Sequence, residues 1–317
     1  MVKCRSDGTS EWHMGPHFQR FPNTKALWAG ERDSVLKEHV FKGLIPDSPI
    51  LGPTDPIVVL GACFARQIAD ALPNTEDWSG DLEKAGLHVF AEHFGNNLVL
   101  LRYLQWAAGL RDVQNDETLQ ITQYGLHKRA GRKPRMGKKT VKLPMDEAAR
   151  TAVLGALTRA RAIILTPGLT EAWLDKKTKE AFVRAINVES FDPKRHVFKV
   201  MTVAENKRYL KEIVGVLRAI NKDIIVVLVV TPQRLRATFT PNGSVTSDIA
   251  NKAILRAAMD EFMSANKDPN VYYFPAFDMI QTCYEHSVYR ESDGRHVDLN
   301  VVKEIFEHFK RYFIRST

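Results

Sequence analysis

The sequence predicts an α/β fold in which a parallel sheet carries helices on both faces. Four apolar runs of strand length occur along the chain, and amphipathic helical patterns separate them. Strands of a parallel sheet are buried on both faces, so they read as continuous apolar runs rather than as alternating patterns. Ligands of such folds bind beyond the carboxyl ends of the strands, which directs the search for function to the loops that follow them.

Length and composition describe an ordinary globular protein. Of the 317 residues, 44% are hydrophobic and 26% are charged, and no apolar run reaches the roughly 18 residues of a membrane-spanning helix. The first residues, "MVKCRSDGTSEWHMG", lack the apolar core of a signal peptide. Cys4, Cys63 and Cys283 lie too far apart in sequence for a disulfide framework or a CxxC metal site. We therefore expect a cytoplasmic protein with no membrane span and no metal site.

The elements are expected in the following order. Residues 1–55, rich in Pro, Gly, Trp and His with one helical pattern near 31–41, form an arm that packs on a core domain of residues 56–317. The expected strands of the core lie in the segments 56–60, 162–168, 224–234 and 271–280, of which the second and third end in a turn. Two helices are expected from apolar stripes, namely Phe64, Ile68 and Leu72, and then Leu98, Leu101, Leu104 and Leu110. Further helices are expected over 145–160, 203–221, 247–266 and 298–314, the last with its N-cap at Asp298.

The net charge of +8 is concentrated in one segment. Lys128–Lys142, "KRAGRKPRMGKKTVK", holds eight Lys or Arg residues and no acid; subtracting these eight from 45 basic residues leaves 37, the number of acidic residues. Its Gly and Pro content predicts a mobile surface loop, inserted at about 127–143. This loop is either a solvated insertion or a grip for phosphate or an acidic polymer. The candidate contacts are Lys128, Arg129, Arg132 and Lys133. No aromatic residues are interleaved with these charges, which argues against nucleic acid as the partner.

The first candidate site is the turn after the first strand, "GACFA" at residues 61–65. A residue between a strand end and a helix start has its side chain raised at the sheet edge, beside outward-pointing N–H groups and the positive end of the helix dipole. That position suits a nucleophile next to an oxyanion site. The alanine methyl of Ala62 can do no chemistry, however. The turn alone favours a tight connection in which Cys63 packs inside as a small apolar residue.

The second candidate site is the loop before the last helix, where Asp293 and His296 stand three residues apart in "DGRH". A carboxylate that binds one imidazole nitrogen fixes the tautomer and leaves the other nitrogen free as a base. Taken alone, this D-x-x-H spacing is common in solvated turns. It gains meaning because the loop follows the last strand and so lies on the same rim as the first turn.

Together the two loops resemble the SGNH or GDSL-like hydrolases. Their residues are most similar to the motifs of the GSCFA family, whose nucleophile motif stands here as "GACFA". Four further segments agree with that family. They are "HFGNN" (93–97), "TPGLTEAW" (166–173), "VVTPQRLRATF" (229–239) and "YFPAFDMI" (273–280). The resemblance covers roughly residues 56–313. It implies a three-layer α/β/α flavodoxin-like sandwich with the site of a serine esterase or O-acyltransferase.

The resemblance also implies roles for individual residues. The serine would stand at Ala62, His296 would be its base, and Asp293 would orient His296. The backbone of Ala62 or Cys63, the Gly95–Asn96 loop and the Gly168 loop would supply oxyanion donors. The wider superfamily has an asparagine near the glycine of its third block. Here Thr170 and Glu171 follow instead, and Glu171 could bind a substrate hydroxyl or stabilise a helix start.

Three explanations fit Ala62. First, Ala62 can be an engineered replacement of serine, and the otherwise intact motif favours this explanation. Second, Ala62 can be native to a binding protein that has lost its catalytic activity. Third, Cys63 can be the nucleophile, as a thiolate at a helix N-terminus. In the first case the chain binds its substrate without turning it over.

The resemblance points to acyl esters of a carbohydrate or polysaccharide, or another small ester, as substrate. Arg234 and Arg236 follow the third strand on the expected rim and are candidate contacts for an anionic substrate. No cofactor is expected, although acyl-coenzyme A is a possible donor for a transferase, with its phosphates held by the basic loop. The rival hypothesis is a non-catalytic protein that binds an acidic glycan or other polyanion through the basic loop. The two hypotheses differ in whether Ala62 and His296 share a pocket.

Overall fold

The computed structural model describes residues 3–4, 10–11, 32–72, 94–112, 120–127, 135–142, 145–186, 190–284 and 287–316. The chain divides into two compact units, Met1–Lys42 and Gly43–Thr317. In the first unit, strands β1 (Lys3–Cys4) and β2 (Ser10–Glu11) pair antiparallel, and helix α2 (Arg32–Val35) continues as the π-helix η1 (Leu36–Phe41). The position of residues 1–42 on the core therefore stays a prediction. Residues 43–55 belong to the second unit, where the N–H of Leu51 donates to Phe313 O at 2.8 Å.

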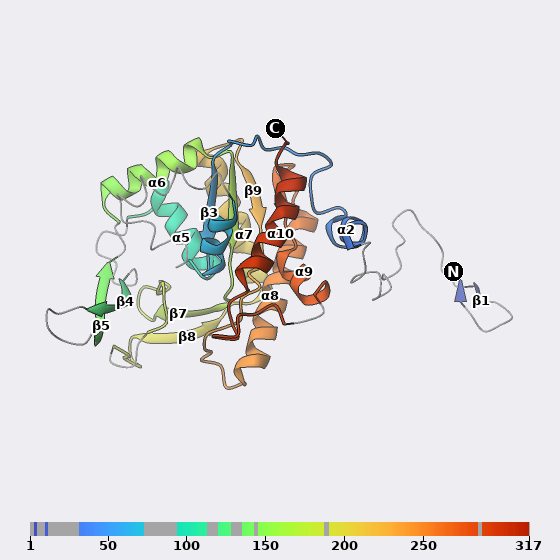
Figure 1. Cartoon of the computed structure of the whole chain (residues 1–317). Helices are drawn as coiled ribbons and strands as arrows, with labels where there is room; N and C mark the ends of the chain where they lie inside the picture. The colour runs from blue at the N-terminus through green and yellow to red at the C-terminus, as the bar shows by residue number, and fades with distance from the viewer. Residues whose placement is uncertain are drawn as a thin grey trace. The chain divides into compact units, whose positions relative to one another are not determined.

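A four-stranded parallel sheet forms the centre of the second unit (Figure 1). Its strands are β3 (Ile57–Gly61), β6 (Ala162–Thr166), β9 (Ile225–Leu228) and β10 (Val271–Tyr273), in the spatial order β10-β9-β6-β3. Each strand pairs parallel with its neighbour, so all carboxyl ends lie at the same edge of the sheet. The four predicted apolar strands and their parallel arrangement are confirmed.

Helices cover both faces of this sheet, which gives a three-layer α/β/α fold. Alternate strand residues such as Val58, Ile163 and Val226 pack into one apolar cluster with four helices. These helices are α5 (Asn97–Ala107), α6 (Glu147–Arg159), α7 (Val203–Ile220) and α8 (Ser244–Ala265). On the other face, α3 (Phe64–Ala71) and α10 (Leu299–Phe313) pack together, with the rings of Phe64 and Phe306 6.1 Å apart. Asp298 caps α10 as predicted, accepting from the Asn300 N–H at 2.8 Å.

Two predicted element boundaries are wrong, and a local backbone feature explains each. The strand predicted over 271–280 ends at Tyr273, and Ala276–Thr282 forms helix α9. Pro275 lacks an N–H for the strand ladder and is the residue before the first helical turn. Leu110 does not join the apolar face of α5, because that helix ends at Ala107 and Gly109 turns the chain with a φ of 71°. Leu110 is consequently 66% exposed.

The basic segment is only partly the loop that its composition predicts. Arg135–Lys142 forms strand β5, which pairs antiparallel with β4 (Gln120–His127) over eight residues from Gln120↔Lys142 to His127↔Arg135. Pairing satisfies backbone N–H and C=O groups whatever the side chains carry, so a high charge does not exclude a strand. The candidate contacts Lys128, Arg129, Arg132 and Lys133 fall outside the described residues.

A second hairpin was not predicted. Strands β7 (Glu171–Asp175) and β8 (His196–Val200) pair antiparallel directly after the loop that follows β6. Trp173 holds the hairpin against the loop after β9 through its ring contact with Phe239, whose centroid lies 5.1 Å away. Glu171 therefore begins a strand, and its suggested role at a helix start is wrong.

Candidate functional site

The turn after β3 requires a glycine at position 61. Gly61 has a φ of 155°, and a Cβ there would lie 2.3 Å from the carbonyl oxygen of Thr166 on the neighbouring strand. The N–H of Ala62 then donates to the same oxygen at 2.9 Å. Cys63 is the residue before the first turn of α3, and both Ala62 and Cys63 are half-buried. The turn thus presents residue 62 at the carboxyl edge of the sheet, at the start of a helix.

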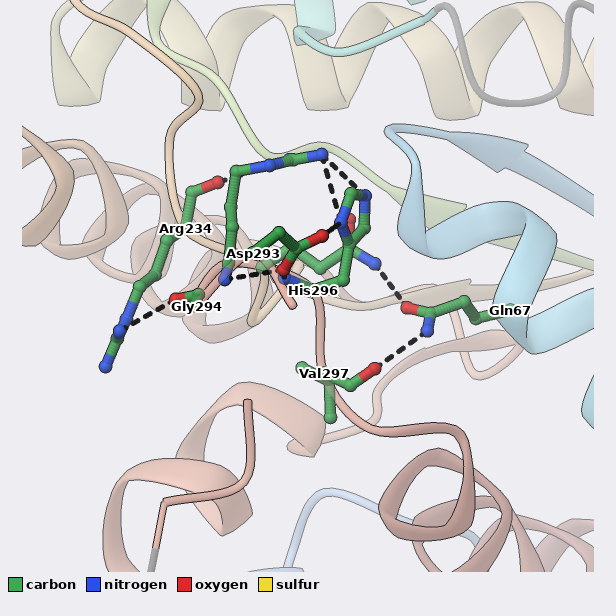
Figure 2. A network of polar contacts seen from close by, with 8 residues as sticks. Gln67, Arg234, Asp293, Gly294, His296 and Val297 are labelled. Carbon is green, nitrogen blue, oxygen red and sulfur yellow. Dashed lines mark hydrogen bonds and ion pairs between the residues drawn. The ribbon is translucent and has the colours of Figure 1, made fainter. Parts of the chain in front are cut away.

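The loop before α10 holds Asp293 and His296 together (Figure 2). The Nδ1 atom of His296 bonds to Asp293 Oδ2, and the backbone N–H of His296 donates to Asp293 Oδ1 at 2.9 Å. Gly294, with a φ of 58°, lets the chain turn between them. The backbone N–H of His296, its side chain and the backbone N–H of Arg295 hold the pKa of the Asp293 carboxyl well below its usual value. Asp293 is therefore an ionised partner that orients the His296 ring.

The second ring nitrogen of His296 is also engaged. The guanidinium of Arg295 places Nη2 2.5 Å from His296 Nε2. Because a guanidinium can only donate, this contact assigns Nε2 as the acceptor and places the proton on Nδ1, toward Asp293. That tautomer is the one a general base needs, with Arg295 covering its free lone pair.

Gln67 of α3 ties the two loops together. Its Nε2 donates to Val297 O at 2.9 Å, and its Oε1 accepts from Gln233 Nε2 in the segment after β9. Gln67 is 6% exposed, and it lies one helical turn beyond Cys63. Figure 2 shows Gln67 reaching across to Val297, beside the Asp293–His296 pair. The helix that begins at the first turn therefore also positions the loop that carries His296.

One cavity of about 940 Å³ joins these parts at the carboxyl edge of the sheet. Ala62, Cys63 and His296 all line it. The other predicted site residues that line it are Gly95, Gly168, Arg234 and Arg236. Asp293 does not line it and acts through His296. Residues 62 and 296, far apart in the sequence, thus share one pocket.

Gly168 keeps the space beside Ala62 open. A Cβ on Gly168 would lie 2.2 Å from Thr231 Cγ2 and 3.1 Å from Ala62 Cβ. The N–H of Gly168 donates to Gly95 O at 2.8 Å, as that of Ala62 does to Thr166 O, so both of these predicted oxyanion donors are engaged within the protein. In the first turn of α3 the N–H of Ala65 donates to Ala62 O at 2.8 Å, so the N–H groups of Cys63 and Phe64 are the donors that remain at this end of the pocket.

Asn96, Thr170 and Glu171 make their contacts with the protein itself. Asn96 caps α5 by accepting from the Val99 N–H at 2.9 Å. The hydroxyl of Thr170 donates to Asn251 Oδ1 at 2.8 Å, and Glu171 accepts from Thr238 Oγ1 at 2.5 Å. None of the three lines the cavity as described, so they brace its walls.

Lys252 of α8 is a site residue that sequence reasoning missed. It lines the cavity although it is only 3% exposed, and its Nζ donates to Gly168 O at 3.1 Å. Burial, together with the positive charge of Arg295, lowers the pKa of Lys252 to about 8, against the opposing effects of Asp248 and Cys63. A signal was present: Lys252 stands three residues before Leu255 and seven before Met259, on the buried face of α8, where a lysine is unusual.

The described residues contain neither a candidate metal site nor a membrane-spanning helix. No cluster of three or more His, Cys, Asp or Glu side chains with the geometry of a metal site occurs among them. Within the same residues, no helix combines the length and apolarity needed to cross a membrane.

A sequence profile of the GSCFA family matches residues 56–309, which spans β3 through most of α10. No curated protein sequence matched the chain. The matched segment contains the turn at Ala62 and the Asp293–His296 loop at its two ends. The chain therefore belongs to the GSCFA family.

Proposed function

We propose that this protein, with serine at position 62, is an SGNH-type ester hydrolase or O-acyltransferase. The observation that carries the proposal is the shared cavity: Ala62 and His296 line one pocket, and Asp293 orients His296 from behind. A protein that only binds its ligand would not need Ala62 and His296 in one pocket.

The chemistry follows from the positions of these groups. A serine hydroxyl at position 62 attacks the ester carbonyl, and His296 Nε2 takes its proton once Arg295 has moved away from that nitrogen. The Asp293 carboxylate stabilises the imidazolium that forms. The N–H groups and dipole at the start of α3 stabilise the oxyanion. The alcohol leaves with the proton from His296, and the acyl-enzyme is then resolved by water or by an acceptor hydroxyl.

The substrate we propose is an acyl ester of a carbohydrate or polysaccharide. The reaction needs no cofactor, and acyl-coenzyme A is the proposed donor if the acyl group goes to an acceptor hydroxyl. In that case the basic segment Lys128–Lys142 would hold the donor's phosphates. Replacing its lysines with glutamine then weakens donor binding, and unchanged affinity would remove this part of the proposal.

The test compares the chain as given with its Ala62→Ser variant in hydrolysis of a chromogenic acetate ester. Loss of a triad serine costs several powers of ten in turnover, so Ala62→Ser is expected to raise kcat by about 1,000-fold or more. Ala62→Ser/His296→Asn is the matched control and should return to the background rate. Activity that is already present with Ala62 and is lost in Cys63→Ala would assign the nucleophile to Cys63 instead.

Two observations favour a second candidate function. The chain carries alanine at the nucleophile position, and the cavity beside it is rich in arginine, which fits a non-catalytic protein that binds an anionic glycan. Failure of Ala62→Ser to hydrolyse any acyl ester, together with binding of an acidic glycan by the unmodified chain, would select this function.

A further inference from the structure

The walls of the cavity carry a strong excess of positive charge. Eight of the lining residues are Arg or Lys, and among the described lining residues one is an acid, Asp70. These cations come from segments far apart in sequence: α3, the β7–β8 hairpin, the loop after β9, α8 and the loop before α10. Because several unlike segments turn cations toward one space, the charge is a property of the cavity rather than of one basic stretch.

Five of these cations have no carboxylate partner among the described residues. Within the part of the chain that the structure describes, no ion pair with an acid is made by Arg66, Arg234, Arg236, Arg290 or Arg295. Arg234 instead donates to Gly294 O at 2.8 Å and covers the ring of Tyr289 at 3.8 Å, and Arg295 contacts His296. These contacts position the guanidinium groups and leave their charge uncompensated.

Several arginines away from the cavity are paired with acids, although, among the described residues, Arg161 and Arg315 bond only to backbone carbonyls. Arg218 binds Asp268 at 2.7 Å, and Arg256 binds Asp278 at 2.9 Å. Even Arg195, on the hairpin side of the cavity, is bound to Asp175 at 2.7 Å. Five arginines without an acid partner in the described part of the chain nevertheless line this one cavity. Like charges brought together without counter-charges cost free energy, which an anionic ligand would relieve.

Two buried polar side chains also line the cavity. Lys252 is 3% exposed, and its ammonium lies 3.9 Å from Asp248 Oδ1, at the edge of ion-pair range. Thr231, which is 2% exposed, lines the same space, and its hydroxyl oxygen has no hydrogen-bond partner among the described residues. A buried hydroxyl normally finds a partner, so its isolation here is consistent with a group that completes its bonding when a polar ligand enters.

We propose that the alcohol part of the ester substrate carries a carboxylate or phosphate group, which the unpaired arginines Arg66, Arg236, Arg290 and Arg295 bind. This inference rests on the proposed function for the ester, and the anion site itself rests only on the geometry of the cavity. Guanidinium groups bind carboxylate and phosphate oxygens through paired, charge-assisted hydrogen bonds. The acyl group would lie toward residue 62 and the anionic group toward the arginines.

Arg295 connects this anion site to the chemistry. Its Nη2 atom rests on His296 Nε2, the atom that must accept the serine proton. An anion in the cavity competes for the same guanidinium and draws it away from the ring. A charged substrate would in this way help to free the base that acts on it, whereas with a neutral ester the guanidinium has to move away without that help.

The test has a binding arm and a turnover arm. Calorimetric titration of the full chain as given uses methyl glucuronide, glucose 6-phosphate and neutral methyl glucoside as probes. Turnover by the full-length Ala62→Ser variant uses the O-acetylated forms of the same three compounds. Arg66→Gln/Arg236→Gln removes two exposed arginines of the cavity. Arg161→Gln is the control, because Arg161 is exposed at the amino end of β6, at the opposite edge of the sheet.

The expected result is that at least one anionic probe binds about tenfold or more tightly than methyl glucoside, with the preference falling as salt rises. The double variant should lose about tenfold per arginine for that probe, while Arg161→Gln loses nothing. Which probe is preferred distinguishes a carboxylate from a phosphate. Equal affinities for the anionic probes and methyl glucoside, or no binding of either anion, would overturn the inference. Turnover without a charge preference would also overturn it, but would leave the proposed function intact. Anion-selective binding with no turnover in Ala62→Ser keeps the anion site and removes the esterase.

Discussion

Replacing Lys252 with methionine removes a buried ammonium group, and we expect this to change how the stability of the protein depends on pH. Burial lowers the pKa of Lys252 from 10.5 to about 8 in the folded chain, while in the unfolded chain the ordinary value of 10.5 applies. Between these two values the unfolded state binds more protons than the folded state, so the free energy of unfolding rises with pH. The stabilisation is fully present above pH 10.5 and is lost as pH falls through 8.

The magnitude follows from the two pKa values. The whole difference corresponds to about 3 kcal/mol, and about 2 kcal/mol of it appears between pH 7 and pH 9.5. The assay is urea unfolding of the chain and of Lys252→Met at both pH values. The unmodified chain should gain about 2 kcal/mol relative to the variant over this interval. The hydrogen bond from Lys252 to Gly168 O is lost in the variant at both pH values, so it cancels from the comparison.

Lys207→Met is the control, because Lys207 is a partly exposed lysine of α7 whose ion pair with Glu261 lies on the surface. It should leave the pH dependence unchanged. Buried Tyr103 and Tyr273, whose pKa values are raised by burial, lower stability only near and above pH 10, and they do so equally in all three proteins. A stability difference between the chain and Lys252→Met that is the same at pH 7 and pH 9.5 would refute the reasoning.

Three further predictions concern the frame of the site. Gln67→Ala leaves Val297 O without its buried donor and is expected to lower the free energy of chemical unfolding by about 1–3 kcal/mol. In an Ala62→Ser background the same change should lower kcat more than it changes KM. An unchanged kcat would show that Gln67 does not position His296. Gly168→Ala sets a methyl 2.2 Å from Thr231 Cγ2, so a loss of about 1–3 kcal/mol is expected from thermal unfolding, and a neutral result would mean that the loop moves freely. The pKa of Asp293 is lowered in the folded chain, so its contribution to stability is present above the usual pKa of 3.8 and is lost as pH falls. The melting temperature should therefore fall more steeply below pH 4 in the unmodified chain than in Asp293→Asn. Parallel melting-temperature curves for the two proteins would contradict this.

The sheet could be predicted because its strands are buried on both faces. The runs at 57–61, 162–166 and 225–228 needed no knowledge of their neighbours to be recognised. Ala62 and His296 could be matched for a related reason: each follows a strand, and parallel strands bring their carboxyl ends to one edge. Helix ends were predicted less well, since Gly109 and Pro275 act through local backbone geometry that apolar periodicity does not contain.

The cationic cavity could not be predicted from composition. Outside Lys128–Lys142 the basic and acidic residues are equal in number, and this balance suggested a neutral remainder. Neutrality in sequence does not imply neutrality in space, however. Arg66 comes from α3, Arg236 from the loop after β9 and Arg290 from the last loop, while acids such as Asp268 and Asp278 pair with other arginines. Only the fold shows which charges become neighbours.

The β7–β8 hairpin has a consequence for how this site can diversify. The hairpin satisfies its own backbone pairing, enters and leaves the core between β6 and α7, and supplies Phe182, Arg195 and His196 to one wall of the cavity. It contributes neither residue 62 nor His296. Ala172, Ala181 and Val183 pack into the core cluster, so the cavity-lining residues of the hairpin are the ones that can vary, altering which substrates fit while residue 62 and His296 stay on their own loops. Exchanging the cavity-lining residues of this hairpin between relatives is expected to change which substrate binds without changing the reaction.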